Sequence, residues 1–198
     1  MAEIRLRPAV LSDAIAIAEV TRRSRAEGFK GVLPAASLQE TLPGRLNLIT
    51  EALNDETRAT LVAVSGEDIV GQCTYDPWMR DDPPGPKDVS EITDLYVDPS
   101  AWRRGVGRRL LDATINDLRD RGSREVVLAT YAAAERALAF YAGAGFVKDP
   151  DWNVVHVGLP ATSSGAEFYR SRPGAVKHRV CKLTMRMSHL RSGLLCPS

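Results

Sequence analysis

Cysteine is scarce in this sequence: the 198 residues contain three, Cys73, Cys181 and Cys196. Their odd number, wide spacing and lack of a CxxC pair argue against a disulfide framework and a structural zinc site. The three histidines also lack the spacing of metal ligands, so we predict no metal centre. A reducing, cytoplasmic environment fits this cysteine usage best.

Long apolar runs are missing as well, and the formal net charge is only +1. No stretch approaches the roughly 20 apolar residues of a membrane span, and the opening MAEIRLRPAV is charged where a signal peptide would be apolar. We therefore expect no membrane span and no export by a cleaved signal. Because 26 Lys and Arg balance 25 Asp and Glu, we also expect no nucleic-acid partner held by bulk positive charge.

What is present is the composition of an ordinary globular protein, with 44% hydrophobic and 26% charged residues. A chain of 198 residues most simply forms one domain. We assign residues 1–187 to that domain and residues 188–198 to a C-terminal tail.

Hydrophobic periodicity predicts an α/β fold, a central mixed β-sheet flanked by helices. Strands are expected near residues 4–7, 60–64, 69–75, 89–97, 126–129, from 146 onward and at 177–187. Helices are expected from a cap at Ser12 or Asp13 to Gly28, from a cap at Thr41 to Leu53, from Gly105 or Val106 to Arg121, and over 132–142. The βαβαβ-like order of the second half favours parallel pairing there. Residues 149–176 show no strong period, and 80–88 predict an exposed loop.

The segment DLYVDPSAWRRGVGRRLL, residues 94–111, has the chemistry of an anion site. A strand ends, glycines and arginines form a turn, and a helix begins, so unpartnered backbone amides and cations meet at one point. A lone GxG motif is also explained if its glycines only permit a tight turn between strand and helix and bind no anion, and this alternative stays open. The segment is neither GxGxxG nor GxxxxGK[ST], which disfavours a Rossmann domain and a nucleotide hydrolase of the P-loop kind.

A second segment, VVLATYAAAERALAFYAGAGF at residues 126–146, follows at a suitable distance. Together the two segments resemble the GNAT superfamily of CoA-dependent N-acetyltransferases. The first is similar to that family's pyrophosphate loop and the second to its FY-x-x-x-GF element, while KGVLP at residues 30–34 resembles a segment before its second helix. The resemblance covers the chain to about residue 148.

The resemblance implies a single-domain GNAT-like fold that binds acetyl-CoA as co-substrate. It implies that Leu95 and Val97 contact the pantetheine arm through their backbone, that residues 103–109 hold the pyrophosphate, that Tyr141 protonates the leaving thiolate, and that Glu91 acts as general base. The implied cofactor-binding residues are Leu95, Tyr96, Val97, Arg103, Arg104, Gly105, Val106, Gly107, Arg108, Arg109 and Ala134.

Two positions depart from the family pattern. Trp102 stands where Arg or Gln is usual, and Ala134 stands where Asn is frequent. Plain alternatives also remain for the two catalytic candidates. Tyr141 could serve only to pack the helix against the core, and Glu91 could be an ordinary solvent-facing or ion-paired carboxylate.

The function expected from the sequence is transfer of acetyl from acetyl-CoA to a primary amine by direct attack in a ternary complex. A carboxylate would raise the fraction of neutral amine, and no covalent intermediate is needed. The expected amine acceptor is a small molecule or a peptide. The sequence leaves open whether the protein forms a homodimer. Four acidic residues could line the entrance of the acceptor site: Asp76, Asp81, Asp82 and Asp94. Phe29 and Trp78 are candidates to line the acceptor pocket itself. The rival is a non-catalytic acyl-CoA-binding or regulatory module of the same fold.

Residues 149–176 are long for a connection between strands. We expect them to fold over the acceptor side or against a partner subunit, with a surface loop as the alternative.

Overall fold

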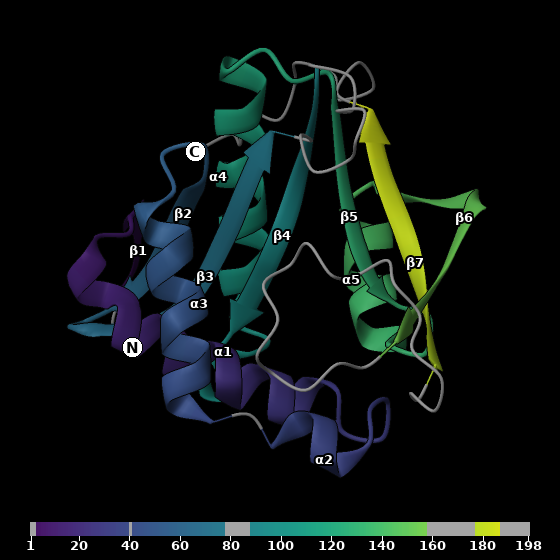
Figure 1. Ribbon diagram of the computed structural model, residues 1–198. Helices are drawn as coiled ribbons and strands as arrows, with labels where there is room; N and C mark the ends of the chain where they lie inside the picture. Colours follow the sequence, from purple (N-terminus) through teal and green to yellow (C-terminus); the bar gives the residue numbers. More distant parts are fainter. Residues whose placement is uncertain (1–2, 40, 78–87, 158–176, 187–198) are drawn as a thin grey trace.

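The protein is described by a computed structural model that covers residues 3–39, 41–77, 88–157 and 177–186 (Figure 1). Its centre is one seven-stranded sheet in the order β1-β2-β3-β4-β5-β7-β6. The strands are β1 (Ile4–Pro8), β2 (Ala59–Ser65), β3 (Asp68–Pro77), β4 (Val89–Val97), β5 (Glu125–Tyr131), β6 (Val147–Val157) and β7 (Lys177–Arg186). Neighbouring strands are antiparallel except β4 and β5, which are parallel, so the sheet is mixed as the sequence predicts.

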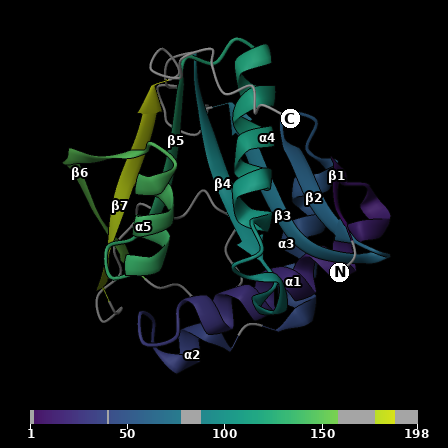
Figure 2. The same ribbon diagram turned by 180° about the vertical axis from the view of Figure 1, so that it is seen from behind.

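Helices cover both faces of this sheet. The elements are η1 (Leu11–Asp13), α1 (Ala14–Gly28), α2 (Ala35–Leu38), α3 (Leu42–Asn54), η2 (Pro99–Ala101), α4 (Val106–Asp120) and α5 (Glu135–Gly143). Figure 1 shows α1 and α3 in front of the sheet, and Figure 2 shows α4 and α5 on the opposite face. The described residues contain no helix long and apolar enough to cross a membrane.

Each face has its own apolar core. Ile17 of α1, Ile49 of α3 and Val62 of β2 belong to the core on one face. Leu110 and Leu111 of α4 are fully buried in the other core, beneath α4 and α5. The apolar positions of α4 repeat with the period of an amphipathic helix, which explains why this side of it turns to the sheet.

Gly71 sets how closely α4 approaches β3. A Cβ atom placed on Gly71 would lie 3.0 Å from a methyl group of Leu110 and 3.3 Å from Tyr96 O. A side chain at this position would push the helix away from the strands, so glycine is needed here for the close approach.

The two parallel strands are paired over part of their length only. Their register runs from Val89 opposite Glu125 to Ile92 opposite Leu128, and no later pair joins them among the described residues. A register shift between Thr74 and Tyr75 of β3 occurs at the same level. Residues 93–97 of β4 thus diverge from β5, as Figure 1 shows.

Most predicted elements are confirmed. The hairpin of β2 and β3, the bounds of β4, and α4 after Gly105 agree with the sequence prediction. Thr41 caps α3, because its hydroxyl accepts a bond from Gly44 N at 3.3 Å. Asp13 stands before α1 but makes no side-chain cap; it pairs with Arg7, with 2.6 Å between Oδ2 and Nη1.

One prediction for the second half is wrong, and another holds in part. Residues 149–157 belong to β6 rather than to an aperiodic segment; Pro150 and a register shift between Lys148 and Asn153 hide the strand pattern. Parallel pairing holds for β4 and β5, but β7 lies between β5 and β6 and is antiparallel to both. The predicted loop 80–88, apart from Asp88, residues 158–176 and the tail 188–198 lie outside the described residues.

Candidate active site

The turn between β4 and α4 has an unusual backbone. Gly105 has φ 76° and Arg103 has φ 63°, so both lie in the left-handed region. Glycine adopts this region freely, whereas a non-glycine residue in it is uncommon. Arg109 N donates to Gly105 O at 3.0 Å as an early hydrogen bond of α4. The amides of residues 106–108 precede it and have no intrahelical acceptor, which makes this helix start suited to an anion.

Gly107 lies where the first turn of α4 meets two other elements. A Cβ atom on Gly107 would stand 3.6 Å from Val97 of β4 and 3.6 Å from Phe140 of α5. The helix start is therefore held between α5 and the end of the diverging part of β4.

The arginines of the turn differ in their surroundings. All four arginines, Arg103, Arg104, Arg108 and Arg109, are exposed. Arg108 is drawn along α4, because its Nε donates to Asp112 Oδ1 at 2.8 Å and its Nη1 donates to Gly143 O at 3.3 Å. The structure thus leaves three cations around the turn and uses Arg108 to link α4 with α5.

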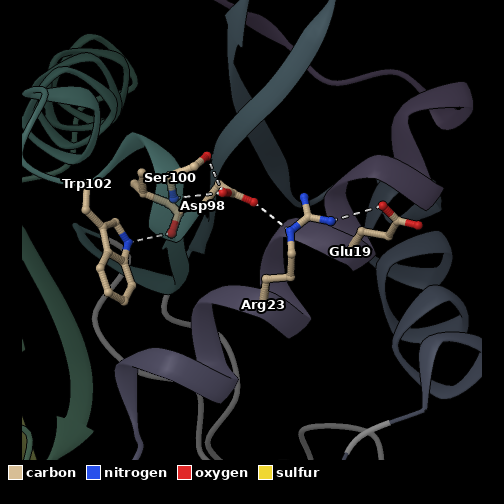
Figure 3. Close-up of polar contacts among 6 residues, drawn as sticks. Glu19, Arg23, Asp98, Ser100 and Trp102 are labelled. Carbon is tan, nitrogen blue, oxygen red and sulfur yellow. Dashed lines mark hydrogen bonds and ion pairs between the residues drawn. The ribbon is translucent and has the colours of Figure 1, made fainter.

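Asp98 anchors the turn to the rest of the molecule (Figure 3). Its carboxylate accepts bonds from Ser100 N at 2.9 Å, Ser100 Oγ at 2.6 Å and Arg23 Nε at 2.7 Å. Because Arg23 belongs to α1, its bond to Asp98 ties the turn to that helix. Within α1, Arg23 also pairs with Glu19 at 3.2 Å. Burial opposes ionisation of this carboxylate, but the bonds from Ser100 and Arg23 outweigh burial, so the pKa of Asp98 lies below its ordinary value of 3.8.

Replacing Asp98 by asparagine is expected to lower the free energy of unfolding by about 1–2 kcal/mol near neutral pH, because it removes charged hydrogen bonds at a buried site. A carboxylate whose pKa is lower in the folded state than in the unfolded state stabilises the fold at pH values above its unfolded-state pKa. This stabilisation is lost as the pH falls through the folded-state pKa. The difference between the wild type and Asp98→Asn should therefore be constant above about pH 5 and shrink below 3.8.

Urea denaturation at several pH values measures this difference. Asp112→Asn is the matched control, since its side chain is 50% exposed and its pair with Arg108 should contribute well under about 1 kcal/mol. Equal effects of the two substitutions at neutral pH would contradict the anchoring role of Asp98.

The diverging part of β4 presents the backbone of Leu95 and Val97. Asp98 N donates to Val70 O of β3 at 2.9 Å. Because successive residues of a strand direct their N–H and C=O groups to alternate sides, Tyr96 faces β3 while Leu95 and Val97 face away from it. Both residues thus offer backbone groups on the side where β5 has diverged. The carbonyl of Val97 already accepts a bond from the Trp102 indole at 2.7 Å.

Tyr141 reaches this region from α5. Its side chain is buried, and its ring packs edge-on against Phe140 and Phe146, with centroids 5.1 and 5.6 Å away. Burial raises the pKa of its hydroxyl well above the ordinary 10.0, and Cys73, Tyr96 and Asp94 add to the rise. Leu95 and Val97 of the diverging part of β4 pack against the core cluster to which Tyr141 belongs.

Glu91 lies one residue before the strands part. It is half-buried, and its neighbours in the ladder are Asp76 of β3 and Val127 of β5. The next residue, Ile92, is buried in the core beneath α4. Alternate residues of a strand face opposite sides, so Glu91 faces α1 and α3. Tyr141 and Glu91 therefore approach the divergence from opposite faces of the sheet.

An aromatic cluster with one arginine lies at the open end of the divergence. Arg25 Nη1 of α1 lies 3.1 Å from Tyr96 Oη of β4, and Phe29 packs edge-on against Tyr131 of β5 at 5.1 Å between centroids. Sequence reasoning considered Phe29 but missed Arg25 and Tyr131. The crowding of arginines near the end of α1 was a signal, although it also suits the negative end of a helix dipole.

Three further predicted positions can be placed. Asp76 does not line an acidic entrance, because its carboxylate is buried and pairs with Arg58 Nε at 3.3 Å. Ala134 is buried before α5 and makes no side-chain cap. Cys73 is fully buried, and burial raises the pKa of its thiol to about 12, as suits a small apolar core residue. Asp81, Asp82 and Trp78 lie outside the described residues.

The model of the acetyltransferase (GNAT) family matches residues 24–146, a range that includes the turn, both diverging strands and α5. The chain belongs to the acetyltransferase (GNAT) family. Serotonin N-acetyltransferase 2 of rice (Oryza sativa subsp. japonica, chloroplastic) is 33% identical to it over 81 residues, which are 41% of this chain and 34% of the rice protein. The chain thus matches about a third of the length of that relative.

Solved structures share the GNAT fold over nearly the whole chain. PaiA N-acetyltransferase of Thermoplasma acidophilum, in complex with coenzyme A, superposes with a TM-score of 0.65 at 16% identity, over 91% of this chain and 98% of its own. The protein yncA of Salmonella typhimurium, solved with acetyl-CoA, gives 0.66 at 18% identity, over 98% and 100%. At these identities the likeness concerns the fold.

Proposed function

We propose that this GNAT family member transfers the acetyl group of acetyl-CoA to a primary amine by direct attack in a ternary complex. The observation that carries the proposal is the divergence of β4 from β5 directly beside the amide-rich start of α4. An unpaired strand edge suits the amides of a pantetheine arm, and the helix start suits a diphosphate. These two features lie next to each other, as one acyl-CoA molecule requires.

Binding is assigned to the backbone of β4 and to the turn. Leu95 and Val97 hold the pantetheine arm, and the amides of residues 106–108 hold the pyrophosphate together with Arg103, Arg104 and Arg109. Because Val97 O already accepts the Trp102 indole, Leu95 and the Val97 amide carry most of the pairing with the arm.

The chemical roles are assigned to Tyr141 and Glu91. The buried hydroxyl of Tyr141 stays protonated at physiological pH, so it is available to donate to the departing thiolate. Glu91, on the other face of the sheet, accepts the proton of the incoming amine directly or through water. An acid and a base on opposite faces of the sheet agree with direct attack without a covalent enzyme intermediate.

The proposal is tested by incubating the protein with acetyl-CoA and a panel of amines that covers small amines and amino acids, an aminoglycoside, and peptides with a free N-terminus or lysine. Release of free CoA thiol that depends on both the amine and the protein is expected. If acetyl-CoA binds but no amine in the panel causes turnover, the non-catalytic acyl-CoA-binding module replaces this proposal.

Replacing Glu91 by glutamine is expected to slow turnover by roughly 10²-fold at low pH. A base matters most where the amine is protonated, so the loss should shrink as pH rises toward the pKa of the acceptor, about 10.4 for a lysine-like amine. The measurement is kcat/KM against pH for both proteins. A loss that stays constant across the pH range would show that Glu91 contributes structure rather than proton transfer.

A further inference from the structure

Arg136 lies over the face of the Trp102 ring, beside the turn that precedes α4. Its guanidinium carbon is 3.6 Å from the centroid of the indole ring. Trp102 belongs to the turn before α4, whereas Arg136 is in the first turn of α5. The contact therefore joins the turn before α4 to the first turn of α5.

Trp102 is fixed on its other side. Its indole Nε1 donates to Val97 O at 2.7 Å, so one edge of the ring is fastened to the end of β4 (Figure 3). With the edge held by β4 and the face covered by Arg136, the ring has a defined orientation. It serves as a platform that keeps the guanidinium at one place beside the turn.

The face of α5 that carries Arg136 also packs against the start of α4. Residues one helical turn apart lie on one face, and Phe140 is one turn after Arg136. Phe140 is the side chain that a Cβ atom on Gly107 would meet at 3.6 Å. Arg136 thus contacts Trp102, and Phe140 approaches Gly107, so this face of α5 runs along the turn and the first turn of α4.

The guanidinium of Arg136 keeps its donors directed outward. Its N–H groups lie in its own plane, so stacking on an aromatic face leaves them directed past the edge of the ring. Arg136 is exposed, and no carboxylate pairs with it among the residues that the structure describes. A stacked arginine with outward donors is suited to bind a phosphate.

We infer that Arg136 binds the diphosphate of the acyl-CoA and that Trp102 is the residue that positions it. This inference rests on the proposed function, and it adds a cation that comes from α5 rather than from the turn. It also gives the indole of Trp102 a role in cofactor binding that does not depend on direct contact with the phosphates.

The test compares ligands with and without phosphate by calorimetry. Arg136→Gln is expected to weaken binding of CoA and of dephospho-CoA by about tenfold, as for the loss of one charge-assisted bond. Binding of S-acetylpantetheine, which lacks the diphosphate, should not change. Arg136→Lys should recover part of the loss, and added salt should reduce the difference between the wild type and Arg136→Gln.

Arg119→Gln is the matched control. Arg119 is an exposed arginine near the other end of α4, roughly 20 Å along the helix from the turn. Its substitution removes the same charge and should leave all three affinities unchanged.

The positioning role is tested at Trp102. Trp102→Phe keeps an aromatic face and should retain most of the affinity for CoA, whereas Trp102→Leu should lose about as much as Arg136→Gln. In the double variant Trp102→Leu with Arg136→Gln the two losses should not add.

Three results would overturn the inference while the wild type still binds CoA. They are unchanged CoA affinity of Arg136→Gln, an equal loss for S-acetylpantetheine, and a loss that disappears with dephospho-CoA. If the wild type does not bind CoA, the proposed function itself fails.

Discussion

Replacing Tyr141 by phenylalanine is expected to lower kcat by roughly 10²-fold or more while affinity for acetyl-CoA stays close to that of the wild type. The substitution removes one hydroxyl and keeps the ring, so the edge-on packing against Phe140 and Phe146 remains. What is lost is the donor that the buried site holds in its protonated form. Single-turnover kinetics with a saturating amine, together with calorimetry of acetyl-CoA, separate the chemical step from binding.

A hydroxyl elsewhere in the same core provides the control. Tyr75 is also buried, and its hydroxyl bonds to Asp117 Oδ2 at 2.6 Å. Tyr75→Phe should lower stability by about 1 kcal/mol and leave kcat unchanged. Near wild-type turnover of Tyr141→Phe, under conditions where chemistry limits the rate, would remove Tyr141 from the mechanism and leave the thiolate to solvent.

Replacing Gly107 by valine is expected to weaken acetyl-CoA binding by roughly 100-fold, about 2.7 kcal/mol at 25 °C. The branched side chain extends beyond Cβ toward Val97 and Phe140, which a Cβ atom alone would already contact at 3.6 Å. It would displace the first turn of α4 and cover its amides. Overpacking of this kind costs about 1–3 kcal/mol of stability, so we expect the fold to survive.

Gly107→Ala is the control for this substitution, because its Cβ makes an ordinary contact with both neighbours. Its affinity for acetyl-CoA should fall much less than that of the valine variant. Calorimetry measures binding, and circular dichroism during thermal unfolding confirms that each variant is folded. A valine variant that binds acetyl-CoA as the wild type does would place the diphosphate elsewhere.

Local features of the site are accessible from the sequence because neighbouring residues determine them. Gly105 takes the left-handed conformation that a strand-to-helix turn needs, and the amphipathic period of residues 106–120 determines which side of α4 is buried. The pattern of residues 89–97 likewise determines the bounds of β4, and the glycines beside arginines indicate an anion site before any fold is known.

Only the tertiary structure decides which distant residues meet at that site. Arg23 lies 75 residues before the Asp98 that it holds, and Arg25 lies 71 residues before Tyr96. Trp102 and Arg136 come together because α5 packs along the start of α4. The insertion of β7 between β5 and β6 is of the same kind, since the choice of strand neighbours depends on packing over the whole sheet. Periodicity reports which face of an element is buried, but it carries no information about the partner that covers that face.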